Sequence, residues 1–399
     1  MAAEGPSRRP RLGDVAPPEV RPYDGAQPTR ALAGRRFVLQ WHVTERCNLR
    51  CRHCYQEGYS TPELELHDLR CIVDQFKELL DHLRRETAPR PFQGHINVTG
   101  GEPFARQDFF ELLDVFAANR RHFTFGILTN GTLIDAAVAQ RLQALGPRFV
   151  QVSVEGSPST NDAVRGRGVY DRTVQSLAHL ARAGIPTVVA FTAHGANHGE
   201  FQPVARLACA SGVTRVWADR LIPSGQGADL DGAVLSPQAT REFFEQMYAA
   251  RQEAVDGFCV TEVSMGRALQ FLVGGGTPYR CLAGEDLVTV QANGDLCPCR
   301  RLPIRVGNLT ETRLIELYDS SELFQALRAH RMSKGCEACR FAQQCRGGLR
   351  CLAYALTGDP FRPDPGCWLT SPTAQGELAV TTPTPMRTPA EPYEGSARC

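Results

Sequence analysis

The stretch CNLRCRHCYQEG covers residues 47–58 and spaces its three cysteines, Cys47, Cys51 and Cys54, as C-x3-C-x2-C. Three thiolates are one fewer than a tetrahedral zinc site requires, and disulfides use cysteines in pairs. A cluster of four irons solves the mismatch, because three irons can bind thiolates while the fourth stays open to a small molecule. The loop therefore predicts a cluster that binds a ligand and delivers an electron to it.

This loop stands near the beginning of a regular alternation of two sequence patterns. Short β-rich runs alternate with segments whose apolar residues recur at helical spacing. Six strands are predicted, at residues 37–43, 95–100, 123–130, 148–156, 186–193 and 214–223. Five helices separate them, at residues 66–85, 109–120, 135–145, 170–184 and 200–212. This order predicts an α/β fold with parallel strands and right-handed crossovers, either as an open doubly wound sheet or as a barrel.

Further motifs stand where the predicted strands end. Gly100-Gly101-Glu102-Pro103 follows the second strand, Thr129-Asn130 closes the third, and Ser153 and Glu155 end the fourth in the sequence SVEG. Arg165 lies shortly afterwards in RGRG. Because ligands bind at the carboxyl ends of parallel strands in both candidate folds, these motifs and the cysteine loop are expected to share one site.

Together, the motifs resemble the radical S-adenosylmethionine (radical SAM) superfamily, with His53 in the position where relatives place an aromatic residue or histidine. The resemblance implies a partial, TIM-like (βα)6 barrel. It implies a [4Fe–4S] cluster on the three cysteines, which cleaves S-adenosylmethionine to methionine and a hydrogen-abstracting 5′-deoxyadenosyl radical. It also implies contacts to S-adenosylmethionine from Tyr55, Gly100, Gly101, Glu102, Thr129, Asn130, Ser153, Glu155 and Arg165. No general base is singled out by spacing.

A second group of cysteines follows the predicted barrel. It contains Cys281, Cys297, Cys299, Cys336, Cys339, Cys345, Cys351 and Cys367. Two four-thiolate clusters would use all eight, and their order resembles the SPASM domain, which implies two auxiliary [4Fe–4S] clusters. The resemblance assigns Cys336, Cys339, Cys345 and Cys367 to one cluster. It assigns Cys281, Cys299 and Cys351 to the other, with Cys297 as a candidate fourth ligand.

This region departs from the family pattern at two places. The usual C-x3-C is C-x5-C at residues 345–351, and Leu287 occupies a position where many relatives have cysteine. If Cys297 is not the fourth ligand, the cluster has an open or non-cysteine site. A zinc ribbon is an alternative, because Cys336 and Cys339 are spaced as C-x2-C with further cysteines at a distance.

The composition of the chain limits its possible partners, its location and the use of its cysteines. Lys and Arg number 44 and Asp and Glu 43, so a formal charge of +1 gives no general attraction to nucleic acid or to anionic membrane. No apolar run reaches the length of a membrane span, and the N-terminus has no signal-peptide core. A cytoplasmic location is expected, where fifteen cysteines indicate metal ligation rather than disulfides. Cys71 and Cys209 fall in helical patterns and are predicted to be plain core residues.

Five segments are predicted. Residues 1–35 form a flexible arm, 36–223 the partial barrel, 224–280 a linker with a bridging helix that begins after Ser236, 281–370 the auxiliary-cluster domain, and 371–399 a disordered Thr/Pro-rich tail. With few long periodic runs, residues 281–370 are expected to be held by metal rather than by an apolar core.

The resemblance favours a peptide-modifying enzyme that installs a thioether or carbon–carbon crosslink, or a related oxidation, on a ribosomally made precursor peptide. The short N-terminal arm implies that any leader-binding module is a separate protein, and a flavodoxin or ferredoxin type of reductant is expected. Arg300 directly follows Cys299, where sulfatase-maturing relatives have aspartate, which disfavours that activity. The alternatives are a tetrapyrrole or redox-cofactor maturase, a non-catalytic cluster carrier, and a nucleotide- or RNA-modifying enzyme, which the balanced charge disfavours.

Overall fold

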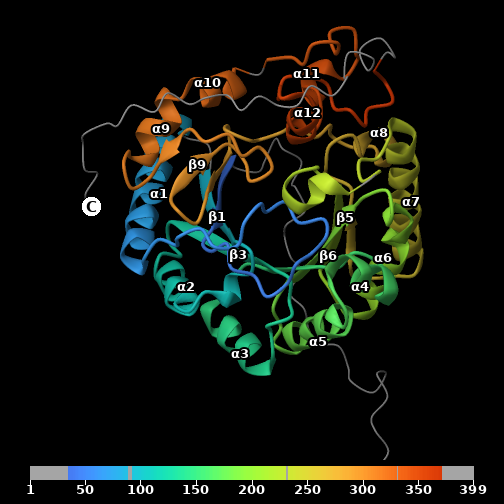
Figure 1. Cartoon of the computed structure of the whole chain (residues 1–399), viewed down its shortest axis with the longest axis horizontal. Coiled ribbons are helices and arrows are strands. Elements are labelled where there is room, and N and C mark those ends of the chain that lie inside the picture. Colours follow the sequence, from blue (N-terminus) through green and yellow to red (C-terminus); the bar gives the residue numbers. More distant parts are fainter. Residues whose placement is uncertain (1–34, 89–91, 231, 330, 371–399) are drawn as a thin grey trace, which may run out of the picture.

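The computed structural model describes residues 35–88, 92–230, 232–329 and 331–370 (Figure 1). The tail expected over residues 371–399 and, apart from Arg35, the arm expected over residues 1–35 lie outside the described residues. Six parallel strands form the centre of the molecule: β1 (Arg35–His42), β2 (Phe92–Thr99), β3 (Phe123–Thr129), β4 (Val150–Ser153), β5 (Thr187–Ala193) and β6 (Arg215–Arg220). All six were predicted, to within a few residues at each end.

These strands belong to one curved sheet with the order β10-β9-β8-β1-β2-β3-β4-β5-β6-β7. Each of β1 to β6 pairs in parallel with its successor, and Ile96 of β2, for example, lies opposite Leu39 of β1 and Phe125 of β3. The order begins at β10 and ends at β7, so the described strands form an open, partial barrel rather than a closed one.

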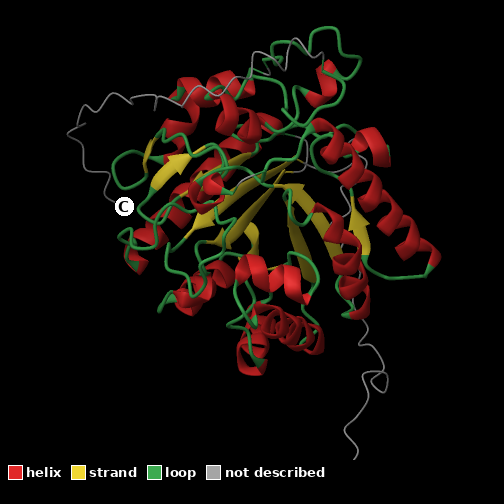
Figure 2. Ribbon diagram, turned by 45° about the vertical axis from the view of Figure 1, so that its right-hand side comes forward, coloured by secondary structure: helices red, strands yellow, loops and turns green. Residues whose placement is uncertain are grey.

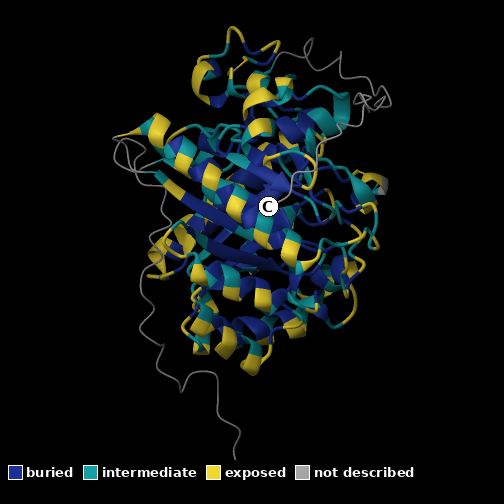
Figure 3. Ribbon diagram, turned by 90° about the vertical axis from the view of Figure 1, so that its left-hand side faces the viewer, coloured by how far each residue is buried: buried dark blue, intermediate teal, exposed yellow. Residues whose placement is uncertain are grey.

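Helices pack around the outside of this sheet (Figures 1 and 2). They are α1 (Leu66–Thr87), α2 (Phe109–Ala118), α3 (Ala136–Leu145), α5 (Val169–Arg182), α6 (Phe201–Ala210) and α7 (Pro237–Asp256). In α1, buried Leu69, Val73, Phe76 and Leu80 recur every three or four residues, which gives the helix one apolar face. Figure 3 shows the strands buried beneath these helices, with exposed positions on the outer sides of the helices.

The cap that the sequence predicted for the bridging helix is present. Ser236 caps α7 by accepting a hydrogen bond from the backbone N–H of Ala239, with Pro237 in the first turn.

Helix α4 (Pro158–Arg165) was not predicted, and it matters because Arg165 is its last residue. Its eight residues are too few for a clear periodic pattern, although Pro158 occupies a position typical of a first helical turn.

The C-terminal region (residues 281–370) is built onto the same sheet. Strand β8 (Leu287–Val290) pairs in parallel with β1, and β9 (Asp295–Cys297) and β10 (Gly307–Asn308) continue antiparallel from it. Its helices are α9 (Leu314–Ser320), α10 (Glu322–Arg328), α11 (Ala342–Cys345) and α12 (Arg350–Thr357). Val288, Val290, Leu314 and Phe324 belong to the main apolar core. The expectation that this region lacks an apolar core is therefore wrong.

The segment between barrel and C-terminal region also contains strand β7 (Glu262–Ser264) and the short helix α8 (Phe271–Gly274). Pairing of β7 with β6 brings the preceding loop to the C-terminal end of α6, where the Thr261 hydroxyl donates to the carbonyl of Val213, just beyond the helix, at 2.6 Å. Cys259 of that loop forms a disulfide with Cys209 of α6. Cys71 is disulfide-bonded as well. The prediction that Cys71 and Cys209 are plain core residues is wrong.

Candidate active site

The cysteine loop leaves the end of β1 and turns back on itself. The backbone N–H of Cys54 donates to the carbonyl of Cys51 at 3.1 Å, and that of Arg52 donates to the carbonyl of Val164 in α4 at 2.9 Å. Cys47, Cys51 and Cys54 are free thiols that line one cavity. The turn thus presents three sulfur atoms to a common space, which fits the three-thiolate set of an iron–sulfur cluster.

This cavity has a volume of ≈ 1100 Å³, counting the space open to solvent. The carboxyl ends of the central strands and residues 300–301 of the C-terminal region form its wall. Seven of the nine predicted S-adenosylmethionine contacts line it: Tyr55, Gly100, Gly101, Thr129, Asn130, Ser153 and Arg165. Glu102 and Glu155 lie behind the wall and are fully buried. The structure therefore brings the strand-end motifs together, as the sequence predicted.

Gly100 and Gly101 pack the end of β2 against the backbone of the cysteine loop. The N–H of Gly101 donates to the carbonyl of Thr44 at 2.8 Å. A Cβ at Gly101 would lie 2.5 Å from the carbonyl oxygens of Glu45 and Arg46, and one at Gly100 would overlap the carbonyl oxygen of Thr44. Glycine is needed here because two backbone segments approach closely.

Glu102 connects the ends of β2 and β3. Its Oε1 accepts a hydrogen bond from the Thr129 hydroxyl at 2.7 Å, and its Oε2 accepts one from the backbone N–H of Asn130 at 2.8 Å. Burial raises the pKa of Glu102 to about 7, against the lowering effect of these hydrogen bonds. The Asn130 amide lies 3.9 Å from the sulfur of Cys47. Glu102 thus positions residues beside the cysteine loop, and its own contact with S-adenosylmethionine stays a prediction.

Glu155, just after the end of β4, has a similar supporting position. Its carboxylate pairs with Nη2 of Arg165 at 2.5 Å and with Nε2 of His53 at 3.2 Å, and it accepts the N–H of Thr192 at 2.7 Å. Although burial alone would raise it, Arg165 and His53 lower the pKa of Glu155 to about 2. Nη1 of Arg165 lies 3.9 Å from the sulfur of Cys51. The carboxylate therefore orients the guanidinium at the cavity wall.

Two arginines surround Asp219 near the end of β6. The buried carboxylate of Asp219 pairs with Arg301 at 2.8 Å and with Arg267 at 2.9 Å. Although burial opposes the effect, these two arginines hold the pKa of Asp219 well below its usual range. The guanidinium of Arg300 lies 5.3 Å from the ring centroid of Tyr55, which is within cation–π distance.

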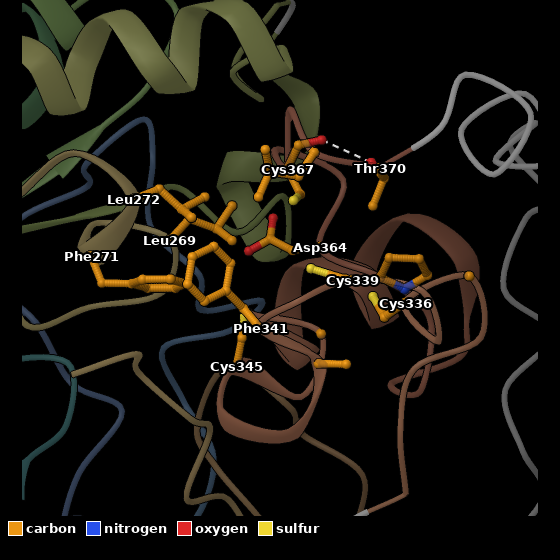
Figure 4. Close-up of a pocket in the computed structure, with 15 residues that line it drawn as sticks. Leu269, Phe271, Leu272, Cys336, Cys339, Phe341, Cys345, Asp364, Cys367 and Thr370 are labelled. Atoms are coloured by element: carbon orange, nitrogen blue, oxygen red, sulfur yellow. Dashed lines mark hydrogen bonds between the residues drawn. The ribbon is translucent and has the colours of Figure 1, made fainter. Parts of the chain in front are cut away.

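A second hollow, of ≈ 460 Å³, lies within the C-terminal region. Four cysteines line it: Cys336, Cys339, Cys345 and Cys367. Figure 4 shows them around the same space, with Asp364 and the apolar side chains of Phe341 and Leu269 beside them. Cysteine sulfurs are the usual ligands of iron–sulfur clusters, so this grouping fits the cluster that the sequence assigned to these residues.

The other cysteine group is less uniform. Cys281, Cys299 and Cys351 pack in a small apolar cluster that is separate from the main core. Cys297 instead lies on β9, where it is buried opposite Thr289 of β8. The structure thus groups three of the four cysteines and places the candidate fourth ligand on the neighbouring strand.

Several cavity residues were missed by sequence reasoning. They are Trp217, Asp219, Arg220, Arg300 and Arg301. The position of Asp219 and Arg220 at the end of the sixth strand was an available signal, because strand ends carry the ligand sites of such folds. The arrival of residues 300–301 from the C-terminal region had no comparable signal.

Comparison with known proteins identifies the family of this chain. The family model of the radical SAM superfamily matches residues 41–208, and that of the SPASM iron-sulfur cluster-binding domain matches residues 281–346. Mycofactocin maturase MftC of Mycolicibacterium smegmatis is 31% identical, covering 83% of this chain and 82% of the relative. AdoMet-dependent heme synthase of Methanosarcina barkeri is 27% identical, covering 83% and 95%. Streptococcus suis SuiB, solved with precursor peptide SuiA, has a TM-score of 0.64 at 15% identity, covering 85% and 77%.

Fold and site define an iron–sulfur enzyme whose chemistry takes place at the mouth of a partial barrel. The chain belongs to the radical SAM superfamily, and its C-terminal region contains a SPASM domain. Its cofactors are S-adenosylmethionine and [4Fe–4S] clusters, which when bound supply one-electron chemistry that leads to hydrogen abstraction. The zinc and cluster-carrier alternatives lose their support.

Proposed function

We propose that this chain is a peptide maturase. It abstracts hydrogen from a ribosomally made precursor peptide and installs a crosslink, such as a thioether or carbon–carbon bond, or a related oxidation. The observation that carries the proposal is the cavity of ≈ 1100 Å³ between the strand ends and the C-terminal region. The three cysteines and most of the predicted S-adenosylmethionine contacts line one part of this cavity, and Trp217, Asp219, Arg300 and Arg301 also line it, which leaves wall for a segment of a second molecule.

The comparisons support a peptide substrate without naming it. The relative at 31% identity is called a maturase, and a protein of similar fold was solved with a precursor peptide bound. A tetrapyrrole substrate is the second candidate, because a heme synthase aligns over 95% of its own length at 27% identity. In either case, this chain's own residues bind the cofactor, orient the substrate and exclude water.

Each group of residues has a proposed role. Cys47, Cys51 and Cys54 hold the cluster that acts on S-adenosylmethionine, and the predicted contacts that line the cavity bind this cofactor, with Glu102 and Glu155 orienting them. Cys336, Cys339, Cys345 and Cys367 hold one auxiliary cluster. Cys281, Cys299 and Cys351 hold the other.

The partners and the location follow from this chemistry. A precursor peptide is the substrate, a separate protein presents its leader, and a flavodoxin or ferredoxin supplies electrons. We place the enzyme in the cytoplasm, where reducing conditions keep cluster-ligating cysteines available as thiolates. The disulfides at Cys71 and between Cys209 and Cys259 are exceptions to that rule.

The test is turnover under anaerobic conditions. The reconstituted protein is incubated with S-adenosylmethionine, dithionite and peptides encoded beside its gene, and 5′-deoxyadenosine and peptide mass are measured. We expect about twelve irons per chain, 5′-deoxyadenosine formation, and a peptide that has lost two hydrogens. The same assay is run in parallel with tetrapyrrole substrates. A modified tetrapyrrole together with unmodified peptides would favour the second candidate.

The matched controls are cysteine variants. Replacing Cys47, Cys51 and Cys54 together with alanine should abolish 5′-deoxyadenosine formation and remove about four irons. The double variant Cys209→Ala/Cys259→Ala removes two cysteines outside the proposed ligand sets and should keep both properties. Equal 5′-deoxyadenosine formation by the triple variant and the wild-type protein would refute the assignment of the cluster.

A further inference from the structure

Tyr59, which none of the predicted site motifs includes, is held against the cysteine loop by Arg50. The Arg50 guanidinium lies 3.8 Å from the centroid of the Tyr59 ring, which is within cation–π distance. Nη1 of Arg50 also donates to the backbone carbonyls of Cys47 and Leu49, at 2.8 Å each, so the arginine is itself fixed to the loop. The Tyr59 ring therefore has a defined place on the segment that carries the three cysteines.

The hydroxyl group of Tyr59 points inward. The residue as a whole is partly exposed, but its hydroxyl oxygen is buried and forms no hydrogen bond of acceptable geometry with any described residue. The polar tip of the side chain therefore faces the protein rather than solvent. Because folded proteins seldom leave a buried hydroxyl unsatisfied, this arrangement points to an acceptor that forms when the site is loaded.

The groups that act on this hydroxyl indicate which acceptor it is. Burial raises the pKa of Tyr59, and so do the charge of Cys54 and a contact of the hydroxyl with its sulfur. The charge of Cys47 acts in the same direction, while Arg50 opposes it. A neutral thiol is a weak acceptor, whereas a thiolate that binds iron carries negative charge and accepts more strongly. The hydroxyl thus lies where a cluster ligand can take its hydrogen bond.

We propose that Tyr59 donates a hydrogen bond to the sulfur of Cys54 when the cluster is bound, and that this bond raises the reduction potential of the cluster. The reduced cluster carries one more negative charge than the oxidised one, so a hydrogen bond to its sulfur stabilises the reduced form more. Tyr59 thereby lets a weaker reductant begin the reaction. The inference rests on the proposed assignment of this cluster to the three-cysteine loop, and it holds for a peptide or a tetrapyrrole substrate alike.

The test is the reduction potential of this cluster. The reconstituted enzyme is poised at a series of potentials without oxygen, and the reduced clusters are followed by electron paramagnetic resonance. The variant with alanine at Cys47, Cys51 and Cys54 supplies the spectrum of the auxiliary clusters, so the remaining signal belongs to the loop. We expect Tyr59→Phe to lower the potential of that signal by about 59 mV, a tenfold change in the ratio of reduced to oxidised cluster. The auxiliary potentials should not move.

A second measurement detects the hydrogen bond itself. After exchange into D₂O, electron–nuclear double resonance records the deuterons that couple to the reduced cluster. Backbone donors such as Leu49, whose N–H lies 3.4 Å from the sulfur of Cys47, contribute to every variant. We expect the wild-type enzyme to show one coupling that Tyr59→Phe lacks. The matched control is Tyr248→Phe, which removes the hydroxyl of a 38% exposed tyrosine on α7 and should keep both the potential and the coupling.

Any of three results would overturn the proposal. The potential of the loop cluster could stay unchanged in Tyr59→Phe, or the auxiliary potentials could fall by the same amount, which would mark a general effect on the fold. The wild-type enzyme and Tyr59→Phe could also show the same deuteron couplings. Each of these results leaves the cluster assignment standing. A triple-alanine variant that keeps every wild-type signal would instead overturn the assignment and the inference together.

Discussion

Arg220 and Asp364 form a bidentate ion pair that joins the end of β6 to the C-terminal region. Nη1 of Arg220 donates to Oδ1 of Asp364 at 2.8 Å and Nη2 to Oδ2 at 2.6 Å, with both side chains 1% exposed. The same carboxylate accepts the N–H groups of Leu349 and Gly366. Because the preceding residue, Asp219, binds Arg301, two consecutive residues of the barrel hold both cysteine groups of the C-terminal region.

Breaking this pair should damage one cluster selectively. Arg220→Met leaves the carboxylate of Asp364 buried without its partner, which costs about 3–5 kcal/mol of stability. Gly366 and Cys367 are adjacent to the displaced carboxylate. We therefore expect loss of the cluster on Cys336, Cys339, Cys345 and Cys367, which lowers the iron content by about four irons per chain. Iron analysis and chemical unfolding measure both effects.

The control for that variant is Arg241→Met. Arg241 pairs with Glu245 on the outside of α7, and both side chains are about half exposed. Removing an exposed pair changes stability by less than about 1 kcal/mol and should leave the iron content unchanged. Unaltered stability and full iron content in Arg220→Met would show that the buried pair does not position the cluster.

Gly101→Ala should disturb the cysteine loop. The added Cβ would meet the carbonyl oxygens of Glu45 and Arg46, and backbone cannot move aside as a flexible side chain can. We expect a loss of about 1–3 kcal/mol in stability and weaker incorporation of the cluster on the three-cysteine loop. Gly199→Ala is the control, because a Cβ there meets no atom within 4 Å. Similar iron content in the two variants would contradict this explanation of the glycine.

Cys351 and Cys297 should differ in their effect on iron binding. Cys351 packs with Cys281 and Cys299, whereas Cys297 belongs to the β8–β9 ladder. We expect Cys351→Ser to lose about four irons and Cys297→Ser to retain them. Equal losses in the two variants would instead make Cys297 the fourth ligand, as the sequence suggested. Iron and sulfide counts after identical reconstitution decide between the two outcomes.

His95 should make the fold sensitive to acid. Burial lowers the pKa of His95 from 6.5 to about 3, while its ring nitrogens lie 2.7 Å from the Thr124 hydroxyl and 2.9 Å from the Asn97 side-chain oxygen. Below pH 6.5 the unfolded chain therefore binds a proton that the folded chain does not. Stability is fully present above pH 6.5 and falls as the pH drops, by up to about 1.4 kcal/mol per unit.

His95→Gln removes this titration. We expect its free energy of unfolding to fall less between pH 7.5 and 5.5 than that of the wild-type holoprotein, by about 1 kcal/mol. His42 and His194, whose pKa values burial also lowers, remain in both proteins and provide the same background. Parallel pH profiles for the two proteins would exclude His95 as a source of the acid sensitivity.

The local part of the fold could be predicted from the sequence, and the non-local part could not. Strands β1 to β6 and the long helices repeat their apolar residues over enough positions to be recognised. Strand β7 has only 3 residues, and both β7 and β8 are defined by pairing with strands that are distant in the sequence. The core of the C-terminal region was missed for the same reason.

The candidate site divides in the same way. The strand-end motifs were predicted to meet, and seven of the nine predicted contacts line the cavity. Sequence motifs could not show that the carboxylates of Glu102 and Glu155 turn away from the cavity to bind neighbouring residues, because the motif gives the position but not the orientation of a side chain. Arg300 and Arg301 reach the cavity through the docking of a whole region, which no local pattern encodes.

The pairing of β8 with β1 limits how this chain can be divided or recombined. Removing the residues after 280 would strip β1 of its neighbour along Val38–Trp41, together with the hydrogen bond from the Val38 N–H to the Asp286 carbonyl. The first barrel strand would become an open edge, ready to pair with another molecule. A truncated barrel should therefore aggregate. A chimera that takes its C-terminal region from a relative should fold when strand β1 is taken from the same relative, so that β8 keeps the β1 with which it pairs.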